Sequence, residues 1–200
     1  YARRSGVPAT WLSETGHALF GGEPGRSDRF IAGLWWLDHL GSMAREGTAG
    51  VVRQALVGGD YGLLSLDGLR PRPDYRLSLL WRRAMGRKVY PVEVEHPFVH
   101  VYRHDRADGV PGYAWLIVNT DPEETATIDT TGVTAADGGD ARCDGWICEG
   151  AARGTAVRIN GRRLGPDDEP TAAAIPDAAA IASAMEVPPA SIAVVRSREA

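Results

Sequence analysis

The chain has 200 residues, of which 44% are hydrophobic, and its formal net charge is −4 at pH 7. This size and composition are typical of one large or two small globular domains. Charges of both signs are interspersed along the sequence, which argues against a nucleic-acid partner. No apolar run approaches the ~18 residues that cross a bilayer, so we expect no membrane span.

The first predicted unit is a strand followed by a helix. Residues 8–13 predict a short buried strand, and a glycine-containing loop follows at 15–27. From about Asp28 to Arg45, apolar residues recur at helical spacing, so we expect a helix there. Ser27 or Asp28 is its expected cap, because a short side chain with an oxygen accepts from the free N–H groups of the first turn.

A second strand and helix follow in the same order. Gly50–Val57 is largely apolar, as expected of a parallel strand that helices cover, and the loop Gly58–Gly62 comes next. A helix is predicted after Pro73, with Asp74 as its cap and Gly86 as its end. The alternation of strands and helices predicts βα units with a parallel sheet.

The pattern changes after Lys88, where the helical period disappears. Short, often alternating segments separated by Gly, Pro and Asp turns predict an antiparallel β-sandwich. The Ala-rich stretch at 171–185 fits either a loose helix or a loop. The predicted strands lie at 89–94, 98–103, 113–119, 125–130, 142–148, 155–159 and 191–196.

Glu14 is the first candidate catalytic residue, because it lies where an apolar strand passes into a loop with glycines. Enzymes with a (β/α)8 barrel carry catalytic residues at the C-terminal ends of strands. A solvated loop glutamate is the alternative. A retaining glycosidase would need a second, protonated carboxyl opposite Glu14. Glu23 and Asp60 are alternatives for that acid, although both are more simply interpreted as polar loop residues.

The loop Gly58–Gly62 closes the second strand at the same end of the predicted sheet. Its glycines allow a ligand to approach backbone N–H groups, which suit an anionic or sugar substituent. Tyr61 adds a hydroxyl donor, and Gln54 is a candidate partner for a sugar hydroxyl. The alternatives are an ordinary βα turn for the loop and a structural polar role for Gln54.

The histidines and cysteines predict no metal site. His96, His100 and His104 are four residues apart, which on a strand separates neighbours by ~13 Å, too far to share one ion. We therefore expect solvated strand histidines. Cys143 and Cys148 would point to opposite faces of a straight strand, so a disulfide between them requires a turn.

Together these residues resemble the C-terminal part of the heparanase-like β-glucuronidases, glycoside hydrolase family 79. The order and the gaps agree over roughly residues 8–90. The matching segments are Trp-Leu-Ser-Glu-Thr at 11–15, Gly-Gly-Glu-Pro at 21–24, Ser-Asp-Arg-Phe-Ile-Ala-Gly-Leu-Trp-Trp-Leu-Asp-His-Leu-Gly at 27–41, Val-Val-Arg-Gln at 51–54, Gly-Asp-Tyr at 59–61, and Pro-Asp-Tyr-Arg-Leu-Ser-Leu-Leu at 73–80.

The resemblance implies that Glu14 is the nucleophile, at the end of the seventh strand of a barrel. It implies that the sugar is bound by Gly21, Gln54, Gly59 and Tyr61. One departure from the family is Phe20, which stands where a glycine is expected and makes the substrate-binding loop bulkier. The family's acid/base, a Glu on the fourth strand, has no counterpart in this chain.

We therefore expect residues 1–88 to be the last two βα units of a (β/α)8 TIM barrel, and residues 89–200 to be an antiparallel β-sandwich domain. Because the chain opens at Tyr1 with no initiator Met, we expect it to be part of a longer enzyme. We expect that enzyme to be secreted or extracellular. The missing N-terminal part of the barrel would be its partner, and this chain alone would be inactive.

The expected activity is that of a retaining glycosidase on glucuronide-containing oligosaccharides or glycans, without a cofactor, and exo action is as well supported as endo action. Two alternatives are a barrel glycosidase for neutral sugars, of the arabinofuranosidase type, and a non-catalytic carbohydrate-binding or structural module.

Overall fold

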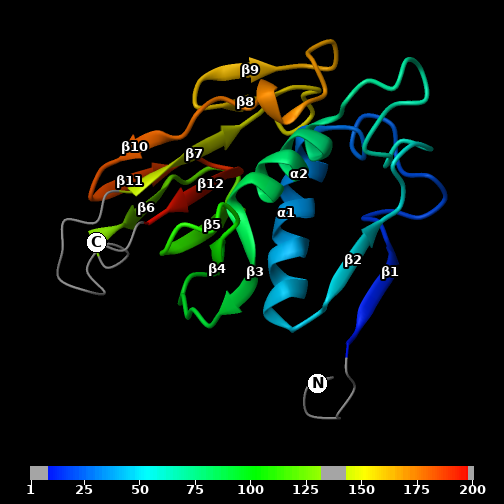
Figure 1. The fold of residues 1–200 in the computed structure, drawn as a ribbon. Coiled ribbons are helices and arrows are strands. Elements are labelled where there is room, and N and C mark those ends of the chain that lie inside the picture. Colours follow the sequence, from blue (N-terminus) through cyan, green and yellow to red (C-terminus); the bar gives the residue numbers. More distant parts are fainter. Residues whose placement is uncertain (1–8, 132–142, 198–200) are drawn as a thin grey trace.

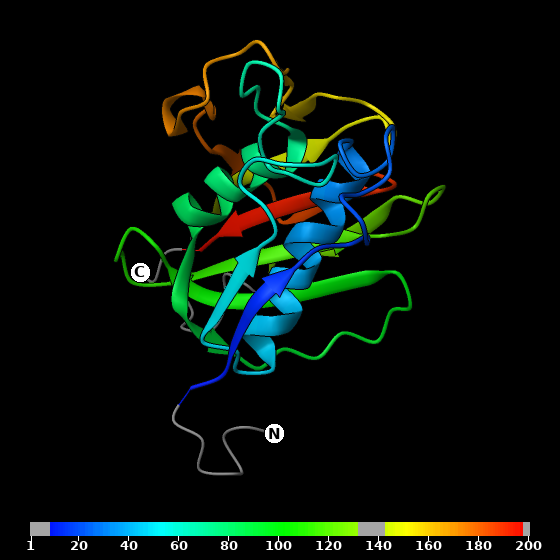
Figure 2. The ribbon, with the colours of Figure 1, turned by 90° about the vertical axis from the view of Figure 1, so that its right-hand side faces the viewer.

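The computed structural model describes residues 9–131 and 143–197. Its N-terminal part contains two βα units, as the alternation of patterns predicted. The first consists of β1 (Trp11–Thr15) and α1 (Phe30–Arg45), and the second of β2 (Gly50–Arg53) and α2 (Pro73–Ala84). β1 and β2 pair in parallel and form a two-stranded sheet, which lies beside the two helices (Figure 1, Figure 2).

The predicted caps of α1 are wrong. The helix begins at Phe30, and Arg29 occupies the N-cap position without a side-chain cap. Ser27 Oγ accepts instead from the N–H of Glu23 at 2.9 Å, and Asp28 Oδ1 accepts from Gly25 at 2.8 Å. Both short side chains therefore stabilise the turn that precedes the helix rather than the helix itself.

The second unit also departs from its predicted bounds. β2 ends at Arg53 rather than at Val57. Gln54 still donates to the Thr15 carbonyl of the neighbouring strand, but from Ala55 onward the chain pairs elsewhere, since Leu63 donates to the Ala55 carbonyl at 3.0 Å. α2 begins at Pro73, before the start that a cap at Asp74 would give, and it ends at Ala84 rather than at Gly86, since the next strand starts at Met85. The N-cap of α2 is Arg72, so the assignment of that position to Asp74 is wrong.

Antiparallel strands follow, as predicted for the second half of the chain. They form an eight-stranded sheet in the order β3-β4-β5-β12-β7-β8-β9, with β10 paired to β7, and a two-stranded sheet of β6 and β11. The bounds are β3 Met85–Tyr90, β4 Val99–Arg106, β5 Tyr113–Asn119, β6 Ala126–Asp129, β7 Cys143–Glu149, β8 Val157–Ile159, β9 Arg162–Leu164, β10 Ala179–Ile181, β11 Ala184–Val187 and β12 Ser191–Arg196.

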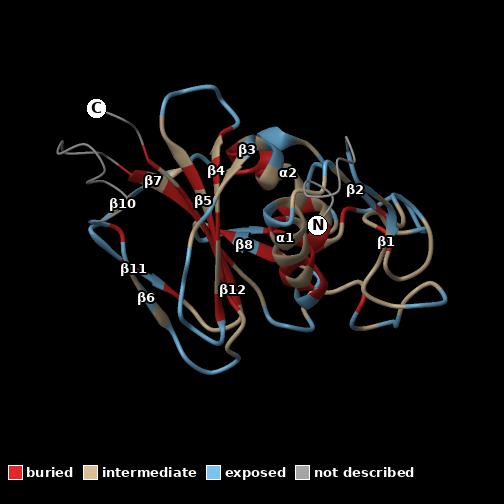
Figure 3. Cartoon of the chain, turned by 90° about the horizontal axis from the view of Figure 1, so that it is seen from below, coloured by how far each residue is buried: buried red, intermediate tan, exposed pale blue. Residues whose placement is uncertain are grey.

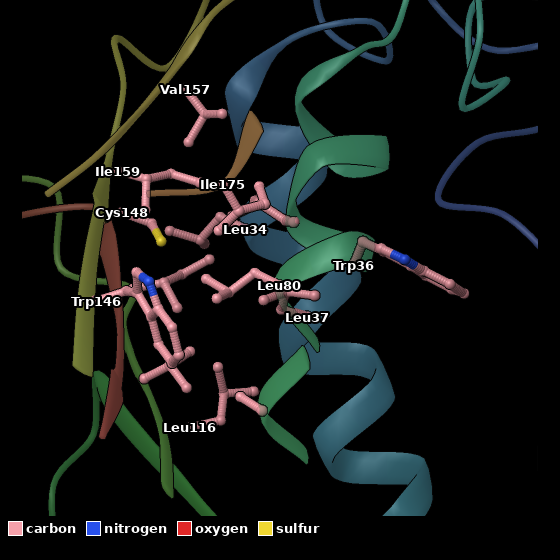
Figure 4. Packing of buried hydrophobic residues seen from close by; sticks show 14 of the residues in the cluster. Leu34, Trp36, Leu37, Leu80, Leu116, Trp146, Cys148, Val157, Ile159 and Ile175 are labelled. Atoms are coloured by element: carbon pink, nitrogen blue, oxygen red, sulfur yellow. The ribbon is translucent and has the colours of Figure 1, made fainter. Parts of the chain in front are cut away.

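The elements are stacked in layers, with α1 and α2 between the eight-stranded sheet and the β1–β2 pair (Figure 3). Leu37 and Leu80 extend from the helices toward Trp146 and Leu116 of the sheet, and all four are fully buried (Figure 4). Complete burial of one such side chain contributes about 1.5–3 kcal/mol, so this interface holds the helices on the sheet.

A smaller cluster lies on the opposite face of the large sheet. It contains Val99, Ile117 and Ala193 of the sheet together with Met185 and Val187 of β11. Within the described residues the second sheet has only β6 and β11, so the β-sandwich stays a prediction. The proposed boundary after residue 88 falls inside β3, and helices and sheet share one core. The division into two domains likewise remains a prediction.

The Ala-rich stretch at 171–185 does not form the loose helix, and only parts of it form a loop. A single 3-10 turn at Ala172–Ala174 is followed by β10 and β11, which pair with β7 and β6. Alternation in these short strands is too brief to stand out against the surrounding alanines.

The expectation of solvated strand histidines is wrong for His104, which is buried, with 2% exposure. Alternate residues of β4 face the helices, and His104 donates from Nδ1 to the Gly86 carbonyl at 2.9 Å. His100 contacts Asp38 of α1 at 2.8 Å, whereas His96 is exposed.

The two cysteines are free and buried. Cys148 lies in the core beneath the helices and Cys143 in the cluster on the opposite face of the sheet. The alternation of side chains along a strand therefore keeps the two thiols apart.

Candidate active site

Glu14 and Gln54 lie at the same end of the parallel pair β1–β2. Glu14 is the penultimate residue of β1 and its side chain is exposed. The next residue, Thr15, accepts a hydrogen bond at its carbonyl from the N–H of Gln54 at 2.8 Å. The structure thus brings these two predicted site residues to neighbouring strand ends, where a (β/α)8 barrel carries its active site.

The loops that follow β1 and β2 contact each other through Gly21 and Gly59. The Gly21 carbonyl accepts from the N–H of Asp60 at 2.6 Å and from the N–H of Tyr61 at 3.2 Å. Gly59 has a φ of +60°, and a Cβ on it would lie 2.9 Å from Gly21 Cα. Glycine at position 59 is therefore required both by the backbone conformation and by the close approach of the two loops.

Tyr61 and Gln54 also lie close to Gly16, at the start of the first loop. A Cβ placed on Gly16 would lie 3.8 Å from Tyr61 Cδ1 and 3.5 Å from the Gln54 carbonyl oxygen. The tertiary structure thus assembles the predicted residues of both loops. Phe20 is fully exposed with a φ of +54°, so it projects from this surface rather than filling it.

Arg53, which the sequence analysis did not assign to the site, lies directly beneath these loops. Its Nη2 donates to the Tyr61 carbonyl at 2.9 Å and to Asp74 Oδ2 at 2.9 Å. The guanidinium carbon lies 5.3 and 5.1 Å from the ring centroids of Trp35 and Trp36. The sequence did contain a signal for this ion pair: Arg53 lies within an apolar strand, and Asp74 lies near the start of the next helix.

Burial, together with the charge of this arginine, lowers the pKa of two neighbouring histidines. Burial lowers the pKa of His17 to about 4, and the positive charge of Arg53 adds to the effect. His17 Nδ1 therefore accepts from Arg53 Nη1 at 3.3 Å, since a guanidinium has only donors. Burial and Arg53 also lower the pKa of His39, whose Nε2 lies 3.3 Å from Thr15 Oγ1.

Asp74 is the buried counter-charge of this network, with 1% exposure. Burial raises its pKa above the ordinary value, while the Arg53 guanidinium and the N–H of Tyr75 oppose that rise. The two charges are thus tolerated in the core because each satisfies the other.

Among the described residues, no contact brings Glu23 or Asp60 beside Glu14, where a glycosidase needs its second carboxyl. Glu23 is exposed and pairs with Arg26 at 3.4 Å on the surface. The backbone N–H of Asp60 bonds to Gly21, and its carbonyl accepts from Arg72. Both residues lie in loops, and the choice between a catalytic and a loop role for them stays a prediction.

In the part of the chain that the structure describes, no three His, Cys, Asp or Glu side chains are grouped so that they could hold a metal ion. Neither α1 nor α2, the helices within those same residues, has the length and hydrophobicity of a membrane-spanning segment.

The sequence of the chain is similar to those of several known proteins. No family model matches the chain. Heparanase-like protein 1 from Arabidopsis thaliana is 39% identical over 122 residues, which are 60% of this chain and 22% of that protein. Baicalin-beta-D-glucuronidase from Scutellaria baicalensis is 41% identical over 127 residues, or 62% of this chain and 24% of that protein. Heparanase from Gallus gallus is 48% identical over 86 residues, 42% of this chain and 16% of that protein.

Solved structures show the fold. The GH51 arabinofuranosidase from Xanthomonas axonopodis pv. citri has a TM-score of 0.61 at 16% identity, covering 95% of this chain and 41% of its own. A GH30 endoxylanase from Clostridium papyrosolvens C71 has a TM-score of 0.60 at 12% identity, covering 100% of this chain and 44% of its own. Both are TIM-barrel glycoside hydrolases, so the fold of the chain corresponds to part of such enzymes.

The chain spans at most about a quarter of the length of the curated relatives described above. Over about 60% of its own length it is similar in sequence to the heparanase-like proteins and β-glucuronidases of glycoside hydrolase family 79.

Proposed function

We propose that this chain supplies part of the active site of a retaining glycosidase that hydrolyses β-glucuronides, with Glu14 as the nucleophile. The observation that carries the proposal is the position of Glu14 at the end of a parallel strand, beside the joined loops of Gly21 and Gly59. The names of the relatives, a β-glucuronidase and heparanases, support the class of substrate.

The proposed chemistry follows from the exposed carboxylate. Glu14 attacks the anomeric carbon and displaces the leaving oxygen, which a second carboxyl protonates, and water then hydrolyses the glycosyl–Glu14 ester. In a retaining enzyme the two carboxyl groups are about 5–5.5 Å apart. We propose that the second carboxyl comes from a strand outside this chain.

We also propose that residues 1–88 are the last two βα units of a (β/α)8 barrel and that residues 89–200 are an accompanying β-sandwich domain. The face of the β1–β2 pair that turns away from the helices supports the assignment of the two βα units to a larger barrel. Trp11 and Val52 are 63% and 45% exposed there. Two parallel strands with open edges and exposed apolar residues are stable only when further strands cover them.

In the proposal, Gly21, Gly59 and Tyr61 lie around the carboxylate of the sugar, Gln54 binds elsewhere in the same sugar subsite, and Phe20 lies at the rim. Glucuronide-containing oligosaccharides are the expected substrates, no cofactor is required by the chemistry, and a secreted location stays a prediction. Exo and endo action are equally compatible with the exposed loops.

Mechanism-based labelling tests this function. The full-length protein is treated with a fluorinated β-glucuronide inactivator, digested, and its peptides are mapped by mass spectrometry. A label on Glu14 is the expected result, because the fluorinated glycosyl ester accumulates on the nucleophile. A label elsewhere would remove Glu14 from the mechanism. Labelling by a neutral fluoroglycoside but not by the glucuronide would reject the proposed substrate class.

The 200-residue chain by itself is expected to be inactive in the same assay. Hydrolysis of an aryl β-glucuronide by this chain alone would show that the barrel strands we place outside it are not needed.

A further inference from the structure

The loop Gly58–Gly62 is held from the helix side through its carbonyl oxygens. Arg72, at the N-cap of α2, donates from Nη1 at 3.0, 2.5 and 2.9 Å to the carbonyl oxygens of Gly59, Asp60 and Gly62. The Tyr61 carbonyl accepts from Arg53. Four consecutive carbonyl groups therefore face two guanidinium groups.

This arrangement restrains a segment that would otherwise be mobile. Gly58 and Gly59 have positive φ values of 132° and 60°, and glycines lose more conformational entropy on ordering than other residues. Hydrogen bonds from a charged donor are about twice as strong as neutral ones. Arg72 therefore provides the interaction energy that selects one conformation of the loop.

The restraint continues from the second loop into the first. A peptide group whose carbonyl binds a cation becomes a stronger donor at its N–H, because hydrogen bonds in a chain polarise one another. The peptides held at the Gly59 and Asp60 carbonyls have their N–H groups on Asp60 and Tyr61, which both donate to the Gly21 carbonyl. Arg72 thus strengthens the hydrogen bonds to the Gly21 carbonyl through the peptide groups that lie between them.

We propose that Arg72 is a positioning residue, which fixes the Gly58–Gly62 loop and Gly21 and thereby tunes the site for an anionic sugar. The identity of that ligand rests on the function proposed above, whereas the restraint on the loops does not. Arg53 differs because its guanidinium is directly ion-paired with the buried Asp74 carboxylate, which interacts with Arg72 only electrostatically and more weakly. The positive charge of Arg72 lies behind the loop and adds an attraction for a carboxylate that a neutral sugar would not experience.

Three variants separate this role from a general effect of losing an arginine. Arg72→Met removes the donors and the charge while keeping an apolar stem, and Arg72→Lys keeps a shorter cation. Arg70→Met is the matched control, because Arg70 is two residues away and its side chain is about half exposed, with a 3.8 Å ion pair to the exposed Asp167. The hydrogen bonds of Arg70 to Ser65 use its backbone and are kept in this variant.

The first measurement is hydrogen–deuterium exchange of the backbone amides of Asp60 and Tyr61. Exchange should become about tenfold faster in Arg72→Met, which corresponds to the loss of one charge-assisted hydrogen bond. It should be intermediate in Arg72→Lys and unchanged in Arg70→Met. Unchanged exchange in Arg72→Met would overturn the proposal, and if that variant does not fold, Arg72→Lys provides the same comparison.

The second measurement uses the full-length protein with an aryl β-glucuronide and the matching neutral aryl β-glucoside. In Arg72→Met the KM for the glucuronide should rise about tenfold while kcat changes little, because binding of the anionic group is lost uniformly. The neutral substrate should be affected less, and Arg72→Lys should recover part of the affinity. Equal losses on both substrates would overturn the tuning for an anionic sugar.

The two measurements distinguish failure of this inference from failure of the proposed function. If the wild-type enzyme does not hydrolyse glucuronides, the proposed function and the tuning both fail, and the exchange rates still decide whether Arg72 fixes the loops.

Discussion

Arg53 and Asp74 form a buried ion pair that joins β2 to α2 beneath the candidate site. The two side chains are 4% and 1% exposed, and Arg53 Nη2 lies 2.9 Å from Asp74 Oδ2. The same guanidinium packs against Trp35 and Trp36 and donates to the Tyr61 carbonyl. Stability of the helix layer and placement of a site loop therefore depend on one side chain.

Removing one partner of this pair is expected to destabilise the chain strongly. Arg53→Met leaves Asp74 buried without a counter-charge, which should reduce the free energy of unfolding by about 3–5 kcal/mol. Urea denaturation followed by circular dichroism measures this loss. Arg26→Met is the matched control, because the Arg26–Glu23 pair is exposed and should contribute about 0–1 kcal/mol.

Replacing both partners should be less harmful than replacing one. The double variant Arg53→Met/Asp74→Leu removes the uncompensated charge and should recover part of the stability lost in Arg53→Met. A double variant no more stable than the single one would show that the lost stability comes from packing against the tryptophans and not from the buried charge.

Glu14→Gln tests the assignment of the nucleophile by rate. In the full-length protein we expect turnover of an aryl β-glucuronide to fall by several orders of magnitude, because the amide cannot form the glycosyl ester. Folding should be retained, since Glu14 is exposed. Glu23→Gln replaces another exposed loop glutamate and should keep near-normal rates. Near-normal turnover in Glu14→Gln would exclude it as the nucleophile.

The lowered pKa of His17 should make the free energy of unfolding depend on pH. Its folded pKa of about 4 is below the ordinary 6.5, so between these values the unfolded chain binds a proton that the folded chain does not. The free energy of unfolding should therefore decrease as the pH falls from about 6.5 to about 4. His39 and His104 act in the same direction, because burial lowers both of their pKa values.

The contribution of His17 can be isolated by substitution. Urea unfolding at several pH values should give a shallower slope for His17→Gln than for the wild type. An NMR titration of the His17 ring protons gives its pKa directly, and a midpoint near 6.5 would contradict the burial of this ring against Arg53 and Trp35.

Gly59→Ala tests the contact between the two site loops. Its Cβ would overlap the Gly21 carbonyl, and Gly59 also has a positive φ. We expect a loss of about 1–3 kcal/mol from backbone strain together with a higher KM for the glucuronide. Gly25→Ala is the control, since Gly25 has a φ of +77° with no atom within 4 Å of its Cβ position. Equal effects of both substitutions would show that the loop contact contributes nothing.

Periodic patterns in the sequence predicted the elements where one period extends over many residues. The apolar spacing over Asp28–Arg45 located α1 to within two residues at its start, and the alternation after Lys88 predicted antiparallel strands. Short strands such as β10 and β11 were missed because three or four residues are too few to show a period next to the surrounding alanines. The caps were wrong because Ser27 and Asp28 bond to other backbone groups.

The sequence by itself determined the two βα units, the glycines of the loops and the place of Glu14 at a strand end, since these depend on local periodicity and backbone freedom. Only the tertiary structure decided that Asp74 is the buried partner of Arg53 and that Arg72 holds the Gly58–Gly62 loop. Hydrogen bonds and ion pairs depend on distances of a few ångström in space, and separation along the chain does not determine those distances.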